Sequence, residues 1–103
     1  MLYVPILGIS LPRENKPHMR LLHTLTCSVT GARCDEVHHP KGLAWGCGMG
    51  MKAPDETAIP LSKRVHDEFH RGGVKSWEAK YGSHLQHLQK TRQKLGLAHY
   101  KGV

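Results

Sequence analysis

A stretch rich in proline and glycine, from Pro40 to Pro60, limits the fold of this chain more than any other feature. Pro40 biases the residue before it away from the helical region, so residues 36–40 are predicted to be extended. The glycines that follow, together with Pro54, make residues 41–54 a loop rather than a regular element. Residues 57–61 form a second extended segment. The sequence therefore predicts two short strands joined by a long loop.

Helical patterns flank this stretch on both sides. Met19, Leu22 and Leu25 recur at helical spacing and predict a short helix over residues 16–25. A second helix is expected over residues 62–70, because Ser62 is a good N-cap and the glycine pair at 72–73 would stop the helix.

The last third of the chain predicts one long helix over residues 76–96, with Ser76 as its N-cap. Apolar side chains share one face of it at helical spacing: Trp77, Tyr81, Leu85, Leu88 and Leu95. This stripe is interpreted as core packing rather than as a platform for stacking bases, and His84 and His87 near its edges as surface or packing residues. With an N-terminal arm over residues 1–12, we expect one small α+β domain spanning residues 1–103.

The chain is strongly basic, with 15 Lys and Arg against 8 Asp and Glu and a formal net charge of +7. Such an excess favours polyanionic partners, of which nucleic acid is the first candidate, although many small domains simply carry a solvated basic surface. No stretch has the apolar length needed to span a bilayer. The apolar residues 1–11 make a poor signal peptide, because Pro5 interrupts them and no basic residue precedes them. We therefore expect a cytoplasmic protein.

Nine histidines in 103 residues point to metal or acid–base chemistry. His38 and His39 are adjacent on the first extended segment. His66 and His70 are four residues apart on a predicted helix, which puts their Cβ atoms about 5–6 Å apart on one face. Either pair alone is usually surface decoration. Both together, in the order strand, glycine-rich loop, strand and helix, predict a ββα unit folded around a metal ion, with positions left open for water and substrate.

The residues around these histidines resemble the HNH motif of the His-Me finger endonucleases. The motif comprises EVHHP at residues 36–40, Asp55, and PLSKRVHDEFHRG at residues 60–72, whose ending is similar to that of the colicin nuclease domains. GMGMKAPD at residues 48–55 and WEAKYG at residues 77–82 instead resemble the phage recombination-enhancement (Ref-like) nucleases. The resemblance covers about residues 13–88 and implies a ββα-metal core over residues 36–72 with flanking helices.

Carried over position by position, the resemblance implies that His39 is the general base for the attacking water. His38, His66 and His70 would hold one divalent metal ion, Mg²⁺, Mn²⁺ or Zn²⁺, which would bind the scissile phosphate and the leaving 3′ oxygen. Asp55 would accept a hydrogen bond from His39 and fix its tautomer. Four basic residues are candidates for phosphate contacts, or equally for solvated surface charges: Lys52, Lys63, Arg64 and Arg71.

One geometrical difficulty concerns the adjacent histidines. On a regular strand, His38 and His39 would point to opposite faces. Both can serve one site if the phosphate lies between them, or if the strand ends or bulges there. If the strand is regular, the roles of ligand and base could be exchanged.

The sequence departs from related nucleases in its cysteines. Many relatives carry two Cys-x2-Cys pairs that bind a structural zinc, but here Thr30 stands three residues after Cys27, and Ser62 and Val65 occupy the later pair. A structural zinc is therefore not expected. Cys27, Cys34 and Cys47 are interpreted as small buried residues. A disulfide between Cys27 and Cys34 could form in an oxidising setting.

These observations predict a metal-dependent DNA endonuclease or nickase that takes part in phage recombination or DNA processing. The expected setting is the cytoplasm of a bacterial host, with a phage- or prophage-encoded protein, DNA as partner, and a recombinase filament as a further possible partner. The alternatives are a non-catalytic nucleic-acid-binding module stabilised by its metal, and a metal-binding regulatory protein whose basic charge is incidental.

Overall fold

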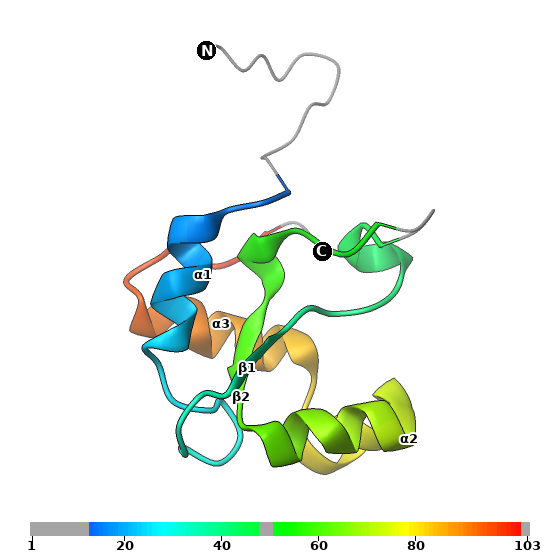
Figure 1. Cartoon of the computed structure of the whole chain (residues 1–103). Coiled ribbons are helices and arrows are strands. Elements are labelled where there is room, and N and C mark those ends of the chain that lie inside the picture. The colour runs from blue at the N-terminus through cyan, green and yellow to red at the C-terminus, as the bar shows by residue number, and fades with distance from the viewer. Residues whose placement is uncertain (1–12, 48–50, 102–103) are drawn as a thin grey trace.

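The computed structural model describes residues 13–47 and 51–101, so the arm predicted over residues 1–12 lies outside the described residues. Three α-helices and one pair of strands form a small α+β domain, which confirms the predicted class (Figure 1). The elements are α1 (Lys16–His23), β1 (Glu36–His38), β2 (Ile59–Leu61), α2 (Lys63–Tyr81) and α3 (His84–Lys94), with short 3₁₀ turns η2 (Leu43–Trp45) and η3 (Asp55–Thr57) between the strands.

The two strands pair antiparallel at the centre of the molecule. Glu36 lies opposite Leu61, and His38 lies opposite Ile59. Pro60 in β2 has no N–H to donate, but its carbonyl accepts a hydrogen bond from the Ser28 amide at 3.0 Å. Two strands leave both outer edges unpaired within the sheet, so a proline is tolerated there. As predicted, the chain forms two short extended segments joined by the long loop.

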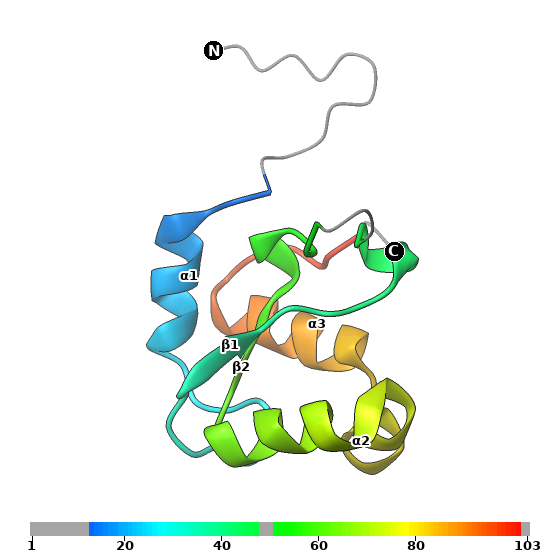
Figure 2. The same cartoon turned by 45° about the vertical axis from the view of Figure 1, so that its right-hand side comes forward.

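The core lies where the strand pair meets α2 and α3 (Figures 1 and 2). Leu61 and Val65 are fully buried there, and Trp77 donates from its indole Nε1 to the carbonyl of Val65 at 3.2 Å. Because a buried indole N–H needs an acceptor, this bond fixes the second half of α2 against the first. The cluster as a whole comprises Cys27, Ile59, Leu61, Val65, Phe69, Trp77 and Leu88.

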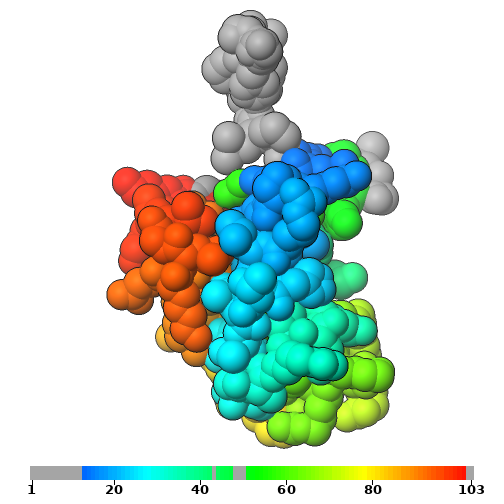
Figure 3. Space-filling view, turned by 60° about the vertical axis from the view of Figure 1, so that its left-hand side comes forward, coloured from blue at the N-terminus to red at the C-terminus, as the bar shows by residue number. Residues whose placement is uncertain are grey.

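Helix α1 lies on the surface, with the C-terminal part of α3 beside it (Figure 3). The Asn15 side chain caps it by accepting the amide of His18 at 3.1 Å, and Pro17 in the first turn needs no partner for its missing N–H. The helix ends at His23, two residues earlier than predicted, because Thr24 closes the last turn. His18 and Leu22 form its buried face. Across the described residues, no helix has the length and apolar character to cross a membrane.

The glycine pair at 72–73 interrupts a helix, as predicted, but does not end it. Gly73 has φ 85° and ψ 172°, so two helical stretches meet at a kink inside α2. The prediction of one helix over residues 76–96 is wrong. The chain breaks at Gly82, where φ is 99°, and Ser83 starts α3 through a capping box with Gln86. Both residues of this capping box are visible in the sequence.

This second break also corrects the predicted apolar stripe. Because α3 starts anew at Ser83, its buried face is not a continuation of the face of Trp77. Leu85 is 37% exposed, whereas His84 and His87 are buried beside Leu88. Nε2 of His84 donates to the carbonyl of Thr57 at 2.7 Å, and His87 contacts Ser28 and the carbonyl of Tyr81. Both histidines are thus packing residues of the core.

Candidate active site

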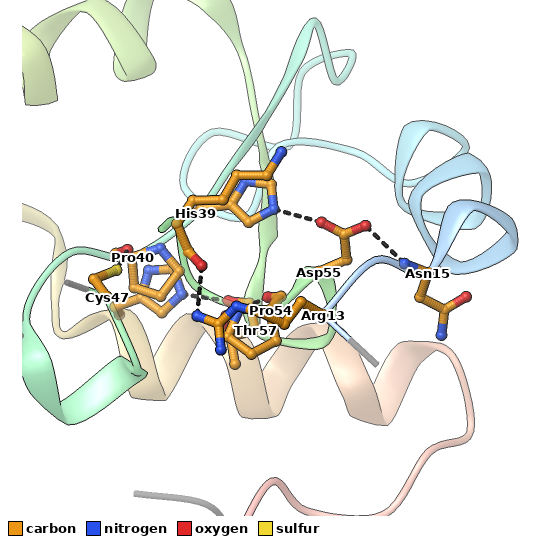
Figure 4. A network of polar contacts seen from close by, with 10 residues as sticks. Arg13, Asn15, His39, Pro40, Cys47, Pro54, Asp55 and Thr57 are labelled. Atoms are coloured by element: carbon orange, nitrogen blue, oxygen red, sulfur yellow. Dashed lines mark hydrogen bonds and ion pairs between the residues drawn. The ribbon is translucent and has the colours of Figure 1, made fainter. Parts of the chain in front are cut away.

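A histidine–carboxylate pair lies just beyond the end of β1. Nε2 of His39 is 2.8 Å from Oδ1 of Asp55, which starts the turn η3 after the long loop (Figure 4). Asp55 is 4% exposed. Its other oxygen accepts the main-chain amide of Asn15 at 2.8 Å. The hydrogen bond expected between His39 and Asp55 is therefore present, and their catalytic roles stay predictions.

The surroundings of Asp55 keep its carboxyl ionised. Burial opposes ionisation, but the hydrogen bonds from the Asn15 amide and from His39 outweigh it and lower the pKa of Asp55. An ionised carboxylate can only accept hydrogen bonds, so Nε2 of His39 must carry the proton that joins them. In the neutral ring, Nδ1 of His39 is then free to accept a proton.

The neighbouring histidine, His38, lies in a different environment. It is 3% exposed and packs against Phe69, with 4.3 Å between ring centroids. Burial, with the charges of nearby histidines as a smaller cause, lowers the pKa of His38 to about 3. Its Nε2 is buried without a hydrogen-bond partner. A neutral imidazole with a free nitrogen is the form in which histidine binds metals.

Two further predicted ligands lie on the first half of α2, near His38. The ring centroid of His66 is 5.1 Å from that of His38 and 4.6 Å from that of His70. Nδ1 of His66 contacts the carboxylate of Glu36. Nε2 of His66 is then the nitrogen available to bind a metal ion. A carboxylate on the outer nitrogen of a histidine is the usual support of a metal-bound imidazole.

The three predicted ligands are neighbours, but they do not converge on one point. Within the described part of the chain, no three histidine, cysteine or acidic side chains are arranged to hold a metal ion. The donor types fit a divalent metal, and the buried free nitrogen of His38 is otherwise unexplained. The structure thus brings the residues together without forming a metal centre, and the ββα-metal core remains a prediction.

The orientation of His38 and His39 answers the difficulty raised by their adjacency. His38 contacts α2 and His39 contacts Asp55, so the two rings point in different directions. β1 ends at His38, so His39 is the first residue beyond the strand. The end of the strand at this point is one of the conditions given above under which both histidines could serve one site.

The four predicted phosphate-binding residues are exposed, but two of them have acidic partners. Lys63 pairs with Asp67 at 3.1 Å, and Arg64 pairs with Glu68 at 3.5 Å. Both pairs are i, i+4 contacts at the surface, which contribute little to the free energy of folding, so a phosphate could replace either carboxylate. Lys52 and Arg71 are also exposed, and Lys52 is near enough to Asp55 to help lower its pKa.

Sequence reasoning missed three residues that support this site. Arg13 and Asn15 hold Asp55 and the loop before it, and Glu36 holds His66. Asn15 could have been found as an N-cap, since it stands three residues before His18 on a predicted helix. Glu36 is two residues before His38, so both face the same side of the strand. Nothing in the sequence links Arg13 to a loop more than thirty residues away.

A cavity beside His38 is too small for a typical substrate. It measures about 100 Å³ and is walled by aromatic rings, among them Trp45, Phe69 and Trp77. Pockets that enclose small-molecule ligands usually measure about 300 Å³ or more. A ligand of that size would therefore not fit within this cavity.

Comparison with known proteins assigns the chain to a family. It belongs to the family described as "Protein of unknown function (DUF968)", which matches residues 11–98. The chain is also similar to the protein named "Uncharacterized protein YdfU" of Escherichia coli (strain K12), with 39% identity over 82 residues. The match covers 76% of this chain and 23% of the relative, so the chain spans less than a quarter of that protein. No solved structure matches the chain.

Proposed function

We propose that this domain is a metal-dependent endonuclease that nicks or cuts DNA by hydrolysing a phosphodiester bond. The observation that carries the proposal is the His39–Asp55 pair, held at 2.8 Å next to three clustered histidines. A purely structural metal site has no use for an unligated histidine whose tautomer is fixed by a buried carboxylate. Such a pair is what a general base needs.

In this mechanism His39 acts through its free Nδ1. The ring takes a proton from a water molecule as that water attacks the phosphorus, the bond between the phosphorus and the 3′ oxygen breaks, and the departing 3′ oxygen takes a proton from solvent. Asp55 holds the ring in the correct tautomer and stabilises the imidazolium that forms. A divalent ion held by His38, His66 and His70 would supply the positive charge that offsets charge developing on the phosphate oxygens.

DNA is the proposed substrate because the charge and the shape of the site both favour a polyanion. The net charge is +7, and Lys63 and Arg64 lie in the first turn of α2, the helix that also carries His66 and His70. Sequence-independent phosphate contacts of this kind suit a nonspecific nuclease. A role in phage recombination or DNA processing in a bacterial cytoplasm, with a recombinase filament as partner, forms part of this proposal and rests on the Ref-like resemblance of the sequence.

A second candidate function is a non-catalytic nucleic-acid-binding module stabilised by a metal. The observation that favours it is the formal net charge of +7, which favours binding of a polyanion whether or not a reaction follows. This module would bind DNA but would not need His39. Nicking of DNA by the wild type that is lost when His39 is removed would therefore distinguish the nuclease from the module.

The test is nicking of supercoiled plasmid by the purified chain with Mg²⁺ or Mn²⁺. We expect nicking that a chelator abolishes, and His39→Ala should lower the rate by about 10²–10⁴-fold, which is the usual contribution of a general base. His23→Ala, an exposed histidine on α1, is the matched control and should cleave like the wild type. Binding of DNA without any nicking by the wild type would favour the non-catalytic module.

A further inference from the structure

The side chain of Arg13 joins the two ends of the segment that precedes Asp55. Its Nη2 lies 2.6 Å from the carbonyl oxygen of Gly46 and 2.7 Å from that of Lys52. One guanidinium nitrogen carries two hydrogens, so both are used in these bonds. Gly46 and Lys52 both belong to the loop that leads to Asp55. The guanidinium therefore fixes the loop at two points just before it reaches Asp55.

The main chain around Arg13 also holds Asp55 directly. The amide of Asp55 donates to the carbonyl of Arg13 at 2.8 Å, and the amide of Asn15 donates back to Oδ2 of Asp55 at 2.8 Å (Figure 4). The Asn15 side chain continues the contact by donating to Glu56 at 2.6 Å. Residues 13–15 thus form hydrogen bonds with both the backbone and the carboxylate of Asp55, the residue that pairs with His39.

We propose that Arg13 is a positioning residue of the candidate active site, which fixes Asp55 and through it the tautomer and orientation of His39. This inference rests on the proposed function. A glycine-rich loop has high conformational entropy, so the position of Asp55 needs contacts from outside the loop. Arg13 supplies them from a segment that lies before α1 and outside the strands and helix that carry the histidines.

A direct contact between Arg13 and a DNA phosphate is the competing role, and the two make different predictions. A phosphate contact would raise KM and change the salt dependence of DNA binding by about one unit of slope when it is removed. A positioning role would lower kcat, because misplacing a reacting group by about 1 Å can cost about a hundredfold in rate. DNA affinity and its salt slope would then stay as they are.

The first experiment compares Arg13→Gln with Arg33→Gln in the plasmid assay. Arg33 is an exposed arginine whose side-chain partner is its near neighbour Asp35, so this control removes the same charge away from the site. We expect a loss in kcat of about 10- to 100-fold for Arg13→Gln, no loss for the control, and partial rescue by Arg13→Lys, which can donate to one or both carbonyls. An unchanged kcat, or a loss confined to KM and the salt slope, would overturn the positioning role.

The second experiment does not depend on nuclease activity. Long-range ¹H–¹⁵N NMR at one fixed pH reports which ring nitrogen of His39 carries the proton. In the wild type and in Arg33→Gln we expect Nε2 of His39 to be protonated, with an N–H signal protected from exchange with water. We expect this protection to be reduced in Arg13→Lys and reduced further in Arg13→Gln. If the wild type shows this signature and Arg13→Gln loses it, the positioning role stands even if the chain cleaves no DNA. If the signal is the same in all variants, the role is wrong even if the chain is a nuclease.

Discussion

Adjacent histidines in this chain have different chemical properties because they face different surroundings. His38 is buried among aromatic rings, which lowers its pKa to about 3 and keeps it neutral. His39 contacts the ionised carboxylate of Asp55, which accepts its Nε2 proton. A neutral ring with an unpartnered nitrogen suits a metal ligand, and a ring oriented by a carboxylate suits a base. The environment of each side chain therefore favours the assignment His38 ligand and His39 base over the exchanged one.

Metal binding should depend on the α2 histidines and not on His39. We expect His66→Ala and His70→Ala each to weaken Mn²⁺ binding by at least about a hundredfold, since loss of an outer-shell partner alone costs about 10–100-fold. His39→Ala and the exposed control His23→Ala should bind like the wild type. The measurement is isothermal calorimetry of the metal-free chain. Unchanged affinity in both α2 variants would rule out the proposed ligand set, and loss of affinity in His39→Ala would make His39 a ligand.

At the scale of elements, the turn between α2 and α3 depends on Gly82. Its φ of 99° lies in the region that residues with a Cβ rarely adopt, and a Cβ built there would lie 2.8 Å from Oε1 of Gln86. Gln86 belongs to the capping box that starts α3. A side chain at residue 82 would therefore strain the backbone and disturb the cap together.

Gly82→Ala should lower the free energy of unfolding by about 1–3 kcal/mol, the usual cost of such a backbone conformation in a non-glycine residue. Gly72→Ala is the control, because Gly72 lies inside α2 and its added Cβ would meet Ser76 Oγ at 3.4 Å. There we expect no loss, or a gain of up to about 1 kcal/mol from the better helix propensity of alanine. Urea unfolding followed by circular dichroism measures both. Equal effects at the two positions would contradict the role given to Gly82.

The helices also show how far local sequence signals extend. Ser62 stands at the N-cap of α2 and α1 starts at Lys16, both as predicted, although the Ser62 side chain makes no capping hydrogen bond and the Lys63 amide donates to Asp35 instead. The prediction of one helix over residues 76–96 is wrong because apolar residues recur at helical spacing across Gly82 and Ser83, where the chain breaks and α3 begins. A kinked α2 and a separately capped α3 pack on the strand pair, and the buried face of α3 carries His84, His87 and Leu88 while Leu85 is exposed.

For the molecule as a whole, buried histidines should make stability depend on pH. Burial lowers the pKa of His84 to about 4, against the smaller opposing effect of its hydrogen bond to Thr57, whereas the unfolded value is about 6.5. Between these values the unfolded chain binds a proton that the folded chain does not. The stability tied to His84 is therefore complete above about pH 6.5 and falls as the pH decreases towards 4, by about 1.4 kcal/mol per pH unit. Burial lowers the pKa of His87 as well, which adds to the same trend.

Urea unfolding of the wild type at pH 7 and pH 5 should show this loss. His84→Gln keeps a donor for the Thr57 carbonyl but cannot titrate, so the variant should lose less stability between the two pH values. His23→Ala, which removes an exposed histidine, should behave like the wild type. The same pH dependence in the wild type and in His84→Gln would show that His84 does not contribute.

Local sequence patterns were enough to predict the α+β class, the two short strands and the residues that lie near the candidate site. These follow from local chemistry: proline and glycine exclude helix, side chains alternate along a strand, and residues four apart share a helix face. The tertiary structure alone decided that Arg13 and Asn15 hold Asp55, that Glu36 holds His66, and that His84 is part of the core. Such contacts join residues up to 42 positions apart, as between Arg13 and Asp55, and they form only when helices and strands pack together, so no local pattern records them.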